Sequence, residues 1–214
     1  MKQLNRQSTQ TLAFTALLVA IMVVMTLLPF LGYIPLGPVN ATLMHIPVMI
    51  GAILLGPKIG AFLGFFFGLT SLYTNTVRPG LTSFVFSPFY SIDGMEGNFL
   101  SLIVCFVPRI LIGIVAYYVF ISLRRIVKNR GGSILPLACA GVLGSLTNTV
   151  FVMSGIYLFF GKQYATVKAM DVSLLFKFIL GVVGTNGVPE AIVAGILVAA
   201  VCGVLLKLRK KQQP

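Results

Sequence analysis

Long apolar segments, separated by short polar or Pro/Gly-rich breaks, run through the whole chain. About 20 apolar residues are enough for a helix to cross a bilayer, and proline or glycine marks where such a helix ends. The pattern predicts an all-α integral membrane protein, a single membrane domain over residues 1–214 built as a bundle of six transmembrane helices. The predicted spans cover residues 10–31, 41–55, 59–73, 99–123, 133–160 and 188–206.

Three apolar stretches are shorter than a full crossing. Residues 41–55 and 59–73 are separated by a Gly-Pro-Lys break, and Pro57 argues against one helix of about thirty residues. We expect these two spans to lie where the bilayer is thin or where neighbouring protein covers their ends. Residues 172–183 precede a Gly-Thr-Asn-Gly break, so we expect a helix that lies on the outer surface or caps the bundle.

Composition narrows the class of protein. The chain is 57% hydrophobic and 9% charged, whereas soluble domains average about 25% charged residues. The net charge of +12 does not indicate nucleic-acid binding, because the basic residues lie at the ends of apolar segments. All three cysteines (Cys105, Cys139 and Cys202) lie in apolar runs without metal-ligand or redox spacing.

The basic residues also predict the orientation. An even number of crossings places both termini on one side, and that side holds most of the sixteen Lys and Arg residues, including the run from Arg124 to Arg130 and the C-terminal tail. Cytoplasmic segments are enriched in Lys and Arg, so both termini are predicted to be cytoplasmic. The opposite side holds Arg78, Lys162, Lys168 and Lys177.

Small residues recur at four-residue spacing in three spans, which allows helices to approach closely in lipid. In the spans at 59–73 and 188–206, this spacing favours packing inside the bundle. In the first span it leaves two interpretations open, packing within the bundle or docking on a partner protein. The residues of that first-span surface are Ala13, Ala16 and Ala20.

Enzymatic signatures are missing. The sequence has no HExxH, GxSxG or phosphate-loop motif, and a single histidine cannot form a Ser/His or multi-His site. We therefore predict no catalytic residues, metal or cofactor. Active transport would need an ion gradient or another subunit, and only Glu190 is placed as an intramembrane carboxylate, which favours a partner or a passive role.

The longest polar interruption, residues 74–98, leads directly into the apolar helix that carries Arg109. An arginine in mid-membrane is unfavourable by about 2.5–3.5 kcal/mol on insertion scales unless it has a partner or faces a wet cavity. Three roles remain open for Arg109: a structural pair with Glu190, a contact with a ligand carboxylate, or a relay between a pocket and a partner surface.

Polar residues of the outer half, mixed with aromatic ones, suit a small-solute pocket. The alternative is an ordinary outer loop with aromatic anchors at the bilayer surface. A mid-span amide or histidine also has the alternative of bonding a neighbouring helix. The candidate binding residues are Asn75, Arg78, Phe84, Phe86, Tyr90, Arg109, Asn148, Asn186, Glu190 and His45.

The whole chain resembles the substrate-binding S components of energy-coupling factor (ECF) vitamin transporters. The resemblance rests on the six short spans, the ALLVA pattern at residues 16–20 and the long loop after the third span. Within the family it is most similar to the pantothenate-type members. That similarity lies in the stretches LMHIPV (43–48), SFVFSPFY (83–90), FVPRILIG (106–113) and NGVPE (186–190).

The resemblance implies a bacterial plasma-membrane subunit that binds a vitamin at its outer face. It implies that the alanine surface of the first span docks on a membrane coupling subunit, which two cytoplasmic ATPases drive. It also implies that the S component then topples in the membrane and releases the vitamin inside. Pantothenate would place its carboxylate on Arg78 or Arg109 and its hydroxyls and amide on Asn75, Asn148 or Asn186.

Other functions remain possible at this stage. The alternative within the same class is another vitamin, pyridoxine or a thiamine precursor. From other classes, the chain would be a stand-alone secondary transporter that uses Glu190 for protons, or an enzyme or scaffold without a solute site.

Overall fold

The computed structural model describes residues 2–28, 33–36, 39–92, 94–127 and 134–211. A 3₁₀ turn spans Ser83–Val85, and two short antiparallel hairpins pair β1 (Tyr33–Leu36) with β2 (Val39–Thr42) and β3 (Ser91–Ile92) with β4 (Met95–Glu96). Most of the other described residues are helical, and short turns and loops join the helices, so the all-α prediction is confirmed. The helices are α1 (Lys2–Leu27), α3 (His45–Leu55), α4 (Pro57–Val77), α5 (Phe99–Ile126), α6 (Ile134–Val167), α7 (Val172–Val182) and α8 (Val188–Lys211).

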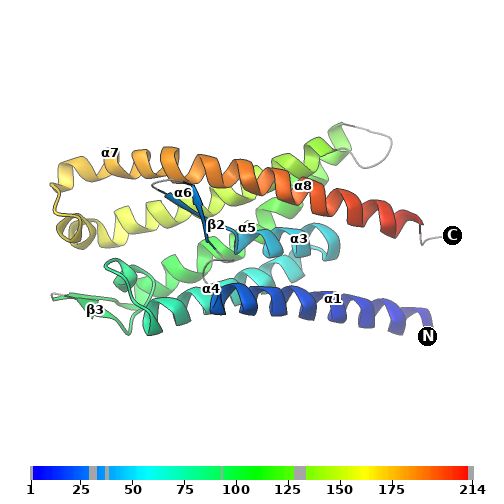
Figure 1. The fold of residues 1–214 in the computed structure, drawn as a ribbon, viewed down its shortest axis with the longest axis horizontal. Coiled ribbons are helices and arrows are strands. Elements are labelled where there is room, and N and C mark those ends of the chain that lie inside the picture. Colours follow the sequence, from blue (N-terminus) through cyan, green and yellow to red (C-terminus); the bar gives the residue numbers. More distant parts are fainter. Residues whose placement is uncertain (1, 29–32, 37–38, 93, 128–133, 212–214) are drawn as a thin grey trace.

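The long helices lie along the long axis of the molecule (Figure 1). The beginning of α1, the end of α8 and the facing ends of α5 and α6 share one end of the bundle. The β3–β4 hairpin and the turn from α6 to α7 lie at the other end. This arrangement agrees with a chain whose termini share one side and whose longest polar segment lies on the opposite side.

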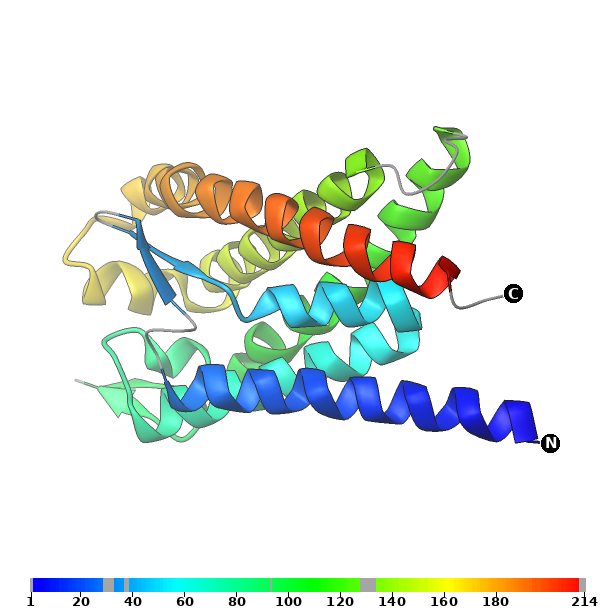
Figure 2. The same ribbon diagram turned by 45° about the vertical axis from the view of Figure 1, so that its right-hand side comes forward.

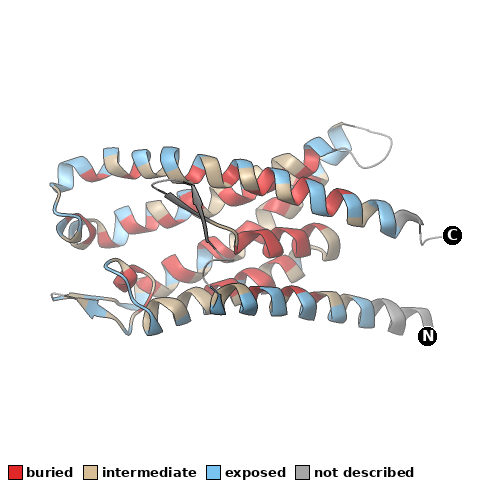
Figure 3. Cartoon of the chain, viewed as in Figure 1, coloured by how far each residue is buried: buried red, intermediate tan, exposed pale blue. Residues whose placement is uncertain are grey.

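The predicted break between the second and third spans is present. Gly56 has φ of 103°, a conformation that glycine adopts without strain, and Pro57 opens α4 at a position where proline fits. The two helices then fold back on each other, because a Cβ added at Gly60 would lie 2.5 Å from the Ala52 side chain. Figure 3 shows α3 buried on all sides, so neighbouring helices cover this short element.

The expected break after residue 183 is wrong. Residues Val183–Gly187 form a π-helical turn that continues α7 into α8. The apolar helical path therefore runs from Val172 to Arg209, 38 residues, instead of a separate surface helix followed by a span. A π turn holds one extra residue, and it keeps the backbone hydrogen-bonded where the two glycines (Gly184 and Gly187) weaken the α-helix.

Four helical segments are long and apolar enough to cross a membrane within the described part of the chain: residues 9–27, 99–126, 134–167 and 172–209. The helix α3 is apolar but only 11 residues long. Several boundaries differ from the prediction: α1 ends at Leu27, α4 and α5 run on to Val77 and Ile126, and α6 continues to Val167. The extra turns of α4, α5 and α6 contain both polar and apolar residues, so hydropathy falls gradually there while the helix continues.

The small-residue stripes of the third and last spans pack inside the bundle, as predicted. A Cβ at Gly64 would collide with the Arg109 carbonyl of α5, and a Cβ at Gly141 would lie 2.7 Å from the Ala194 carbonyl of α8. Close backbone approach of this kind is what holds helices together in lipid. In α8 the stripe residues Ala191 and Ala199 are buried.

The core consists of two apolar clusters. One lies among α1, α3, α4, α5, α6 and α8 and includes Met22, Met49 and Leu63. The other lies toward the β3–β4 end and includes Phe84, Phe160 and Leu175, with the Phe84 and Phe160 rings edge-to-face at 5.9 Å. The cavity described below lies where these two clusters meet.

Candidate functional site

A cavity of about 310 Å³ lies among α1, α3, α4, α5 and α6. Its wall includes Phe67 from the first cluster and Phe86, which packs on the second. Among the described residues that line it there are two arginines and no Asp or Glu, so its walls favour an anionic group. The lining residues are Met25, Thr26, Thr42, Met44, Phe67, Thr70, Ser71, Thr74, Asn75, Arg78, Phe86, Arg109 and Asn148.

Arg109 is positioned by the residue before it. Pro108 lies inside α5 and has no N–H, so the carbonyl of Val104 four residues earlier loses its helical donor. The guanidinium of Arg109 supplies the missing donor, with Nη1 2.7 Å from the Val104 carbonyl oxygen. A backbone carbonyl without a donor is unfavourable inside a membrane. The Arg109 side chain supplies the donor that Pro108 lacks, and this hydrogen bond directs the guanidinium along α5.

Two aromatic rings hold the same guanidinium. The Arg109 Cζ atom lies 5.6 Å from the centroid of the Phe67 ring and 5.0 Å from that of Phe86. Only 6% of Arg109 is exposed, and cation–π contacts are worth about 2 kcal/mol or more when the cation is desolvated. The cavity therefore contains a buried, oriented positive charge.

The polar rim is tied together by side-chain hydrogen bonds. Asn75 donates from Nδ2 to the Ser71 carbonyl and accepts at Oδ1 from the Ser83 hydroxyl, at 2.8 and 2.7 Å. The hydroxyls of Thr76 and Ser87 lie 2.7 Å apart. These bonds connect the last turns of α4 to the 3₁₀ turn and fix the loop wall that carries Phe86.

Arg78 ends α4 at the rim of the cavity. Its backbone N–H donates to the Thr74 carbonyl at 2.9 Å, and its side chain is exposed, in contrast to Arg109. The two cations therefore occupy the outer and inner parts of one site.

Five of the predicted binding residues line the cavity: Asn75, Arg78, Phe86, Arg109 and Asn148. The other five lie elsewhere. Phe84 is fully buried in the second cluster, where its carbonyl accepts a hydrogen bond from Ser101, and Tyr90 packs on the same cluster. These two aromatics therefore pack in the second cluster and do not line the cavity, because alternation along a loop does not reveal which ring turns inward.

The remaining three are not among the residues that line the cavity. Glu190 accepts a hydrogen bond from the backbone N–H of Thr42 at 2.6 Å, so this carboxylate has a partner at the end of β2. Figure 2 shows this hairpin lying between the end of α1 and the beginning of α3. Asn186 accepts from the Thr185 hydroxyl in the π turn, and His45 is buried in the first turn of α3, beside the cavity residue Met44.

The sequence as a whole matches the family described as the ECF transporter, substrate-specific component, over residues 10–202. The chain belongs to this family. A protein of Lactococcus lactis subsp. cremoris named pantothenic acid transporter PanT is 40% identical over 209 residues, covering 96% of this chain and 98% of the relative. A Leuconostoc mesenteroides subsp. mesenteroides protein named pantothenate transporter PanT is 33% identical over 212 residues, covering 97% and 98%.

This chain is therefore a substrate-specific component of a vitamin uptake system, a multi-pass protein of the bacterial cell membrane and not an enzyme. The predicted resemblance to S components is confirmed. The walls of its cavity also include residues that sequence patterns did not single out, chiefly from α1 and from the middle of α4: Met25, Thr26, Phe67, Thr70 and Ser71. Their signal is a hydroxyl or sulfur on one face of an otherwise apolar helix, which periodicity alone does not distinguish from packing.

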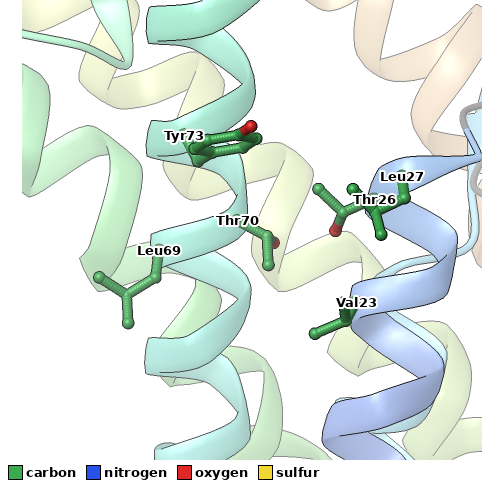
Figure 4. Close-up of a pocket in the computed structure, with 6 residues that line it drawn as sticks. All are labelled: Val23, Thr26, Leu27, Leu69, Thr70 and Tyr73. Carbon is green, nitrogen blue, oxygen red and sulfur yellow. The ribbon is translucent and has the colours of Figure 1, made fainter.

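A second, smaller hollow of about 210 Å³ adjoins the cavity in this substrate-specific component. It lies between α1 and α4, and Figure 4 shows Thr26 and Thr70 pointing toward each other across this gap. Both threonines line the two hollows, but each hydroxyl also bonds its own helix, to the carbonyls of Met22 and Phe67. Their methyl groups are therefore available to the apolar gap.

The outer face of α1 is open. Ala13, Ala16 and Ala20 are exposed, as are Leu17 and Ile21 beside them, and Figure 3 shows α1 as the helix with much of its surface uncovered. In the substrate-specific component, the alanine surface defined by these three residues does not pack within the bundle. The interpretation that remains for it is contact with lipid or with another protein.

Proposed function

We propose that this substrate-specific component binds pantothenate in the 310 Å³ cavity and delivers it inward through an ATP-driven ECF complex. The observation that carries the proposal is the buried guanidinium of Arg109 in a cavity without an acidic lining residue among those described. The names of the two relatives, both pantothenate transporters, support the choice of vitamin.

The chemistry of the cavity fits the parts of this ligand. The carboxylate of pantothenate takes Arg109 as its main partner, since charge-assisted hydrogen bonds are strong where water is excluded. Arg78 at the rim attracts the anion and covers it. Asn148 and the hydroxyl-bearing residues of α4 contact the amide and hydroxyls, and the methionines and phenylalanines enclose the hydrocarbon part.

Energy for uptake comes from other subunits. The chain has no phosphate loop, and its candidate proton carrier, Glu190, holds the end of β2 by a hydrogen bond. We assign the exposed alanine surface of α1 to docking on the membrane coupling subunit, which two ATPases drive, with both termini of this chain in the cytoplasm. The segments that we assign to the cytoplasm include Lys58, Arg124 and Arg125, and an enrichment of Lys and Arg on that side supports the assignment.

Titration calorimetry on the purified chain tests the ligand. Wild type should bind pantothenate and bind pantothenol, in which an alcohol replaces the carboxylate, roughly 10- to 100-fold more weakly. Arg109→Gln should lose the preference between the two compounds. Arg125→Gln is the control, because Arg125 is an exposed arginine in the last turn of α5. This variant should keep the preference for pantothenate over pantothenol.

Three other results would decide against parts of the proposal. Binding of pyridoxine or a thiamine precursor in place of pantothenate would overturn the substrate while keeping the site. Failure to bind any vitamin of the panel would overturn the solute site. Equal affinity of wild type for pantothenate and pantothenol would overturn the role of Arg109.

A further inference from the structure

Three buried polar atoms beside the cavity have no hydrogen-bond partner among the described residues: Nε2 of His45, Oγ of Ser145 and Oδ1 of Asn148. His45 is 2% exposed and Ser145 is 1% exposed. A buried polar group without a hydrogen-bond partner is unfavourable, because it has lost its bonds to water without replacement. Three unpaired atoms in one region therefore indicate a place that a polar group of another molecule completes.

Helix geometry brings the three residues together. A Cβ at Gly144 of α6 would lie 2.6 Å from Sδ of Met49 on α3, so the two helices touch at this level. They run in opposite directions in Figure 1, and residues four apart share a helix face. His45 precedes Met49 by four residues on α3, and Asn148 follows Gly144 by four residues on α6. His45 and Asn148 therefore lie opposite each other, one helical turn away from the contact between Met49 and Gly144. Ser145 lies on the same side of α6 as Asn148.

This group lies at the inner end of the cavity. Asn148 itself lines the cavity, and so does Met44, the neighbour of His45. Arg109 lies close by on α5, because Val104 meets Gly155 of α6 and Ala116 meets Gly144, and Arg109 lies between these two levels. The cavity thus has a positive part at Arg109 and an uncharged, hydrogen-bonding part at the α3–α6 contact.

We infer that His45, Ser145 and Asn148 form a subsite for an uncharged hydroxyl of the bound solute. The inference rests on the proposed function, because it assigns the end of pantothenate that lies away from the carboxylate. A hydroxyl both donates and accepts, and this matches an amide oxygen as acceptor together with a serine hydroxyl and an imidazole nitrogen. A site built to bond a hydroxyl rejects analogues without it, so the subsite determines specificity.

Ser145→Ala is the sharpest test, with Ser154→Ala as its control because Ser154 is an exposed serine on the same helix. Calorimetry on the purified chain would use pantothenate and its two monodeoxy analogues, each with one hydroxyl replaced by hydrogen. Ser145→Ala should weaken pantothenate binding about tenfold. It should leave the affinity for one of the two deoxy analogues as in wild type, and Asn148→Ala should show the same pattern.

Thermal unfolding without ligand separates binding from structure. Removing a hydroxyl that has no partner should leave the melting temperature of the ligand-free chain unchanged or raise it. A lower melting temperature, or a variant that does not fold, would show that the hydroxyl is structural and would overturn the subsite.

The remaining outcomes are distinct from a failure of the proposed function. If wild type does not bind pantothenate, the proposed function fails and this subsite fails with it. If wild type binds but Ser145→Ala and Asn148→Ala bind all three compounds as wild type does, the polar atoms bond only water and the subsite alone is overturned. An equal loss for all three compounds would likewise overturn it.

Discussion

At the scale of single residues, Pro108 accounts for the position of the Arg109 side chain. A proline inside a membrane helix leaves a carbonyl without its donor, and the next side chain along bonds that carbonyl at 2.7 Å. The bond directs the guanidinium toward Phe67 and Phe86. Arg109 is thereby a buried, oriented cation in the wall of the cavity.

Replacing the proline tests this coupling. In Pro108→Ala the restored backbone N–H competes for the Val104 carbonyl and releases Arg109 from it. We expect the melting temperature to stay the same or rise, while affinity for pantothenate falls several-fold because the guanidinium is no longer held in place. Calorimetry and thermal unfolding on the same sample measure both. Unchanged affinity would mean that the aromatic rings alone position Arg109.

At the scale of elements, close helix contacts set the shape of the cavity. Gly64 of α4 faces the carbonyl of Arg109, and its neighbours Phe67, Thr70 and Ser71 line the site. The approach of α4 to α5 therefore fixes the distance across the cavity. The stripe of glycines, which looks like simple packing in the sequence, thus also sets the width of the cavity.

Gly64→Ala should destabilise the chain by about 1–3 kcal/mol, because the added methyl forces α4 away from the α5 backbone. Gly181→Ala on α7 is the matched control, since a Cβ there meets nothing within 4 Å and alanine favours the helix. Thermal unfolding of the two variants measures the difference. Equal melting temperatures would show that the α4–α5 contact relaxes freely.

At the scale of the whole molecule, the cavity and the exposed alanine surface are separate. The cavity lies inside the bundle, and the alanine surface of α1 (Ala13, Ala16 and Ala20) faces outward. Binding and delivery should therefore be separable by mutation, which is the behaviour of a component that captures a solute and passes it on through partners.

The variant Ala16→Leu/Ala20→Leu should bind pantothenate normally but lose uptake in liposomes that contain the coupling subunit, both ATPases and ATP. Large side chains would block close helix approach on a partner while leaving the cavity unchanged. Ala200→Leu, at an exposed alanine of α8, should transport as wild type. Full uptake by the double variant would exclude this docking surface, and proton-driven uptake by the chain alone would favour a secondary transporter.

The sequence by itself determined the class of the molecule, the helix break at Gly56 and Pro57, and the five of the ten proposed site residues that line the cavity. Run length and charge suffice for this, because membrane insertion depends on the composition of each segment. Arg109 and Asn148 were recognisable because polar groups in apolar spans are rare and need a reason. The family was recognisable from short stretches at residues 83–90 and 106–113.

Only the tertiary structure decided which faces meet. In the folded chain Phe84 lies in the core and Glu190 bonds the end of β2. A π turn joins α7 to α8, and Thr26 and Thr70 line the cavity. The tertiary structure also left buried polar atoms of His45, Ser145 and Asn148 without hydrogen-bond partners among the described residues. Periodicity describes one helix at a time, whereas a cavity depends on the distances between helices, and small residues far apart in the sequence set those distances.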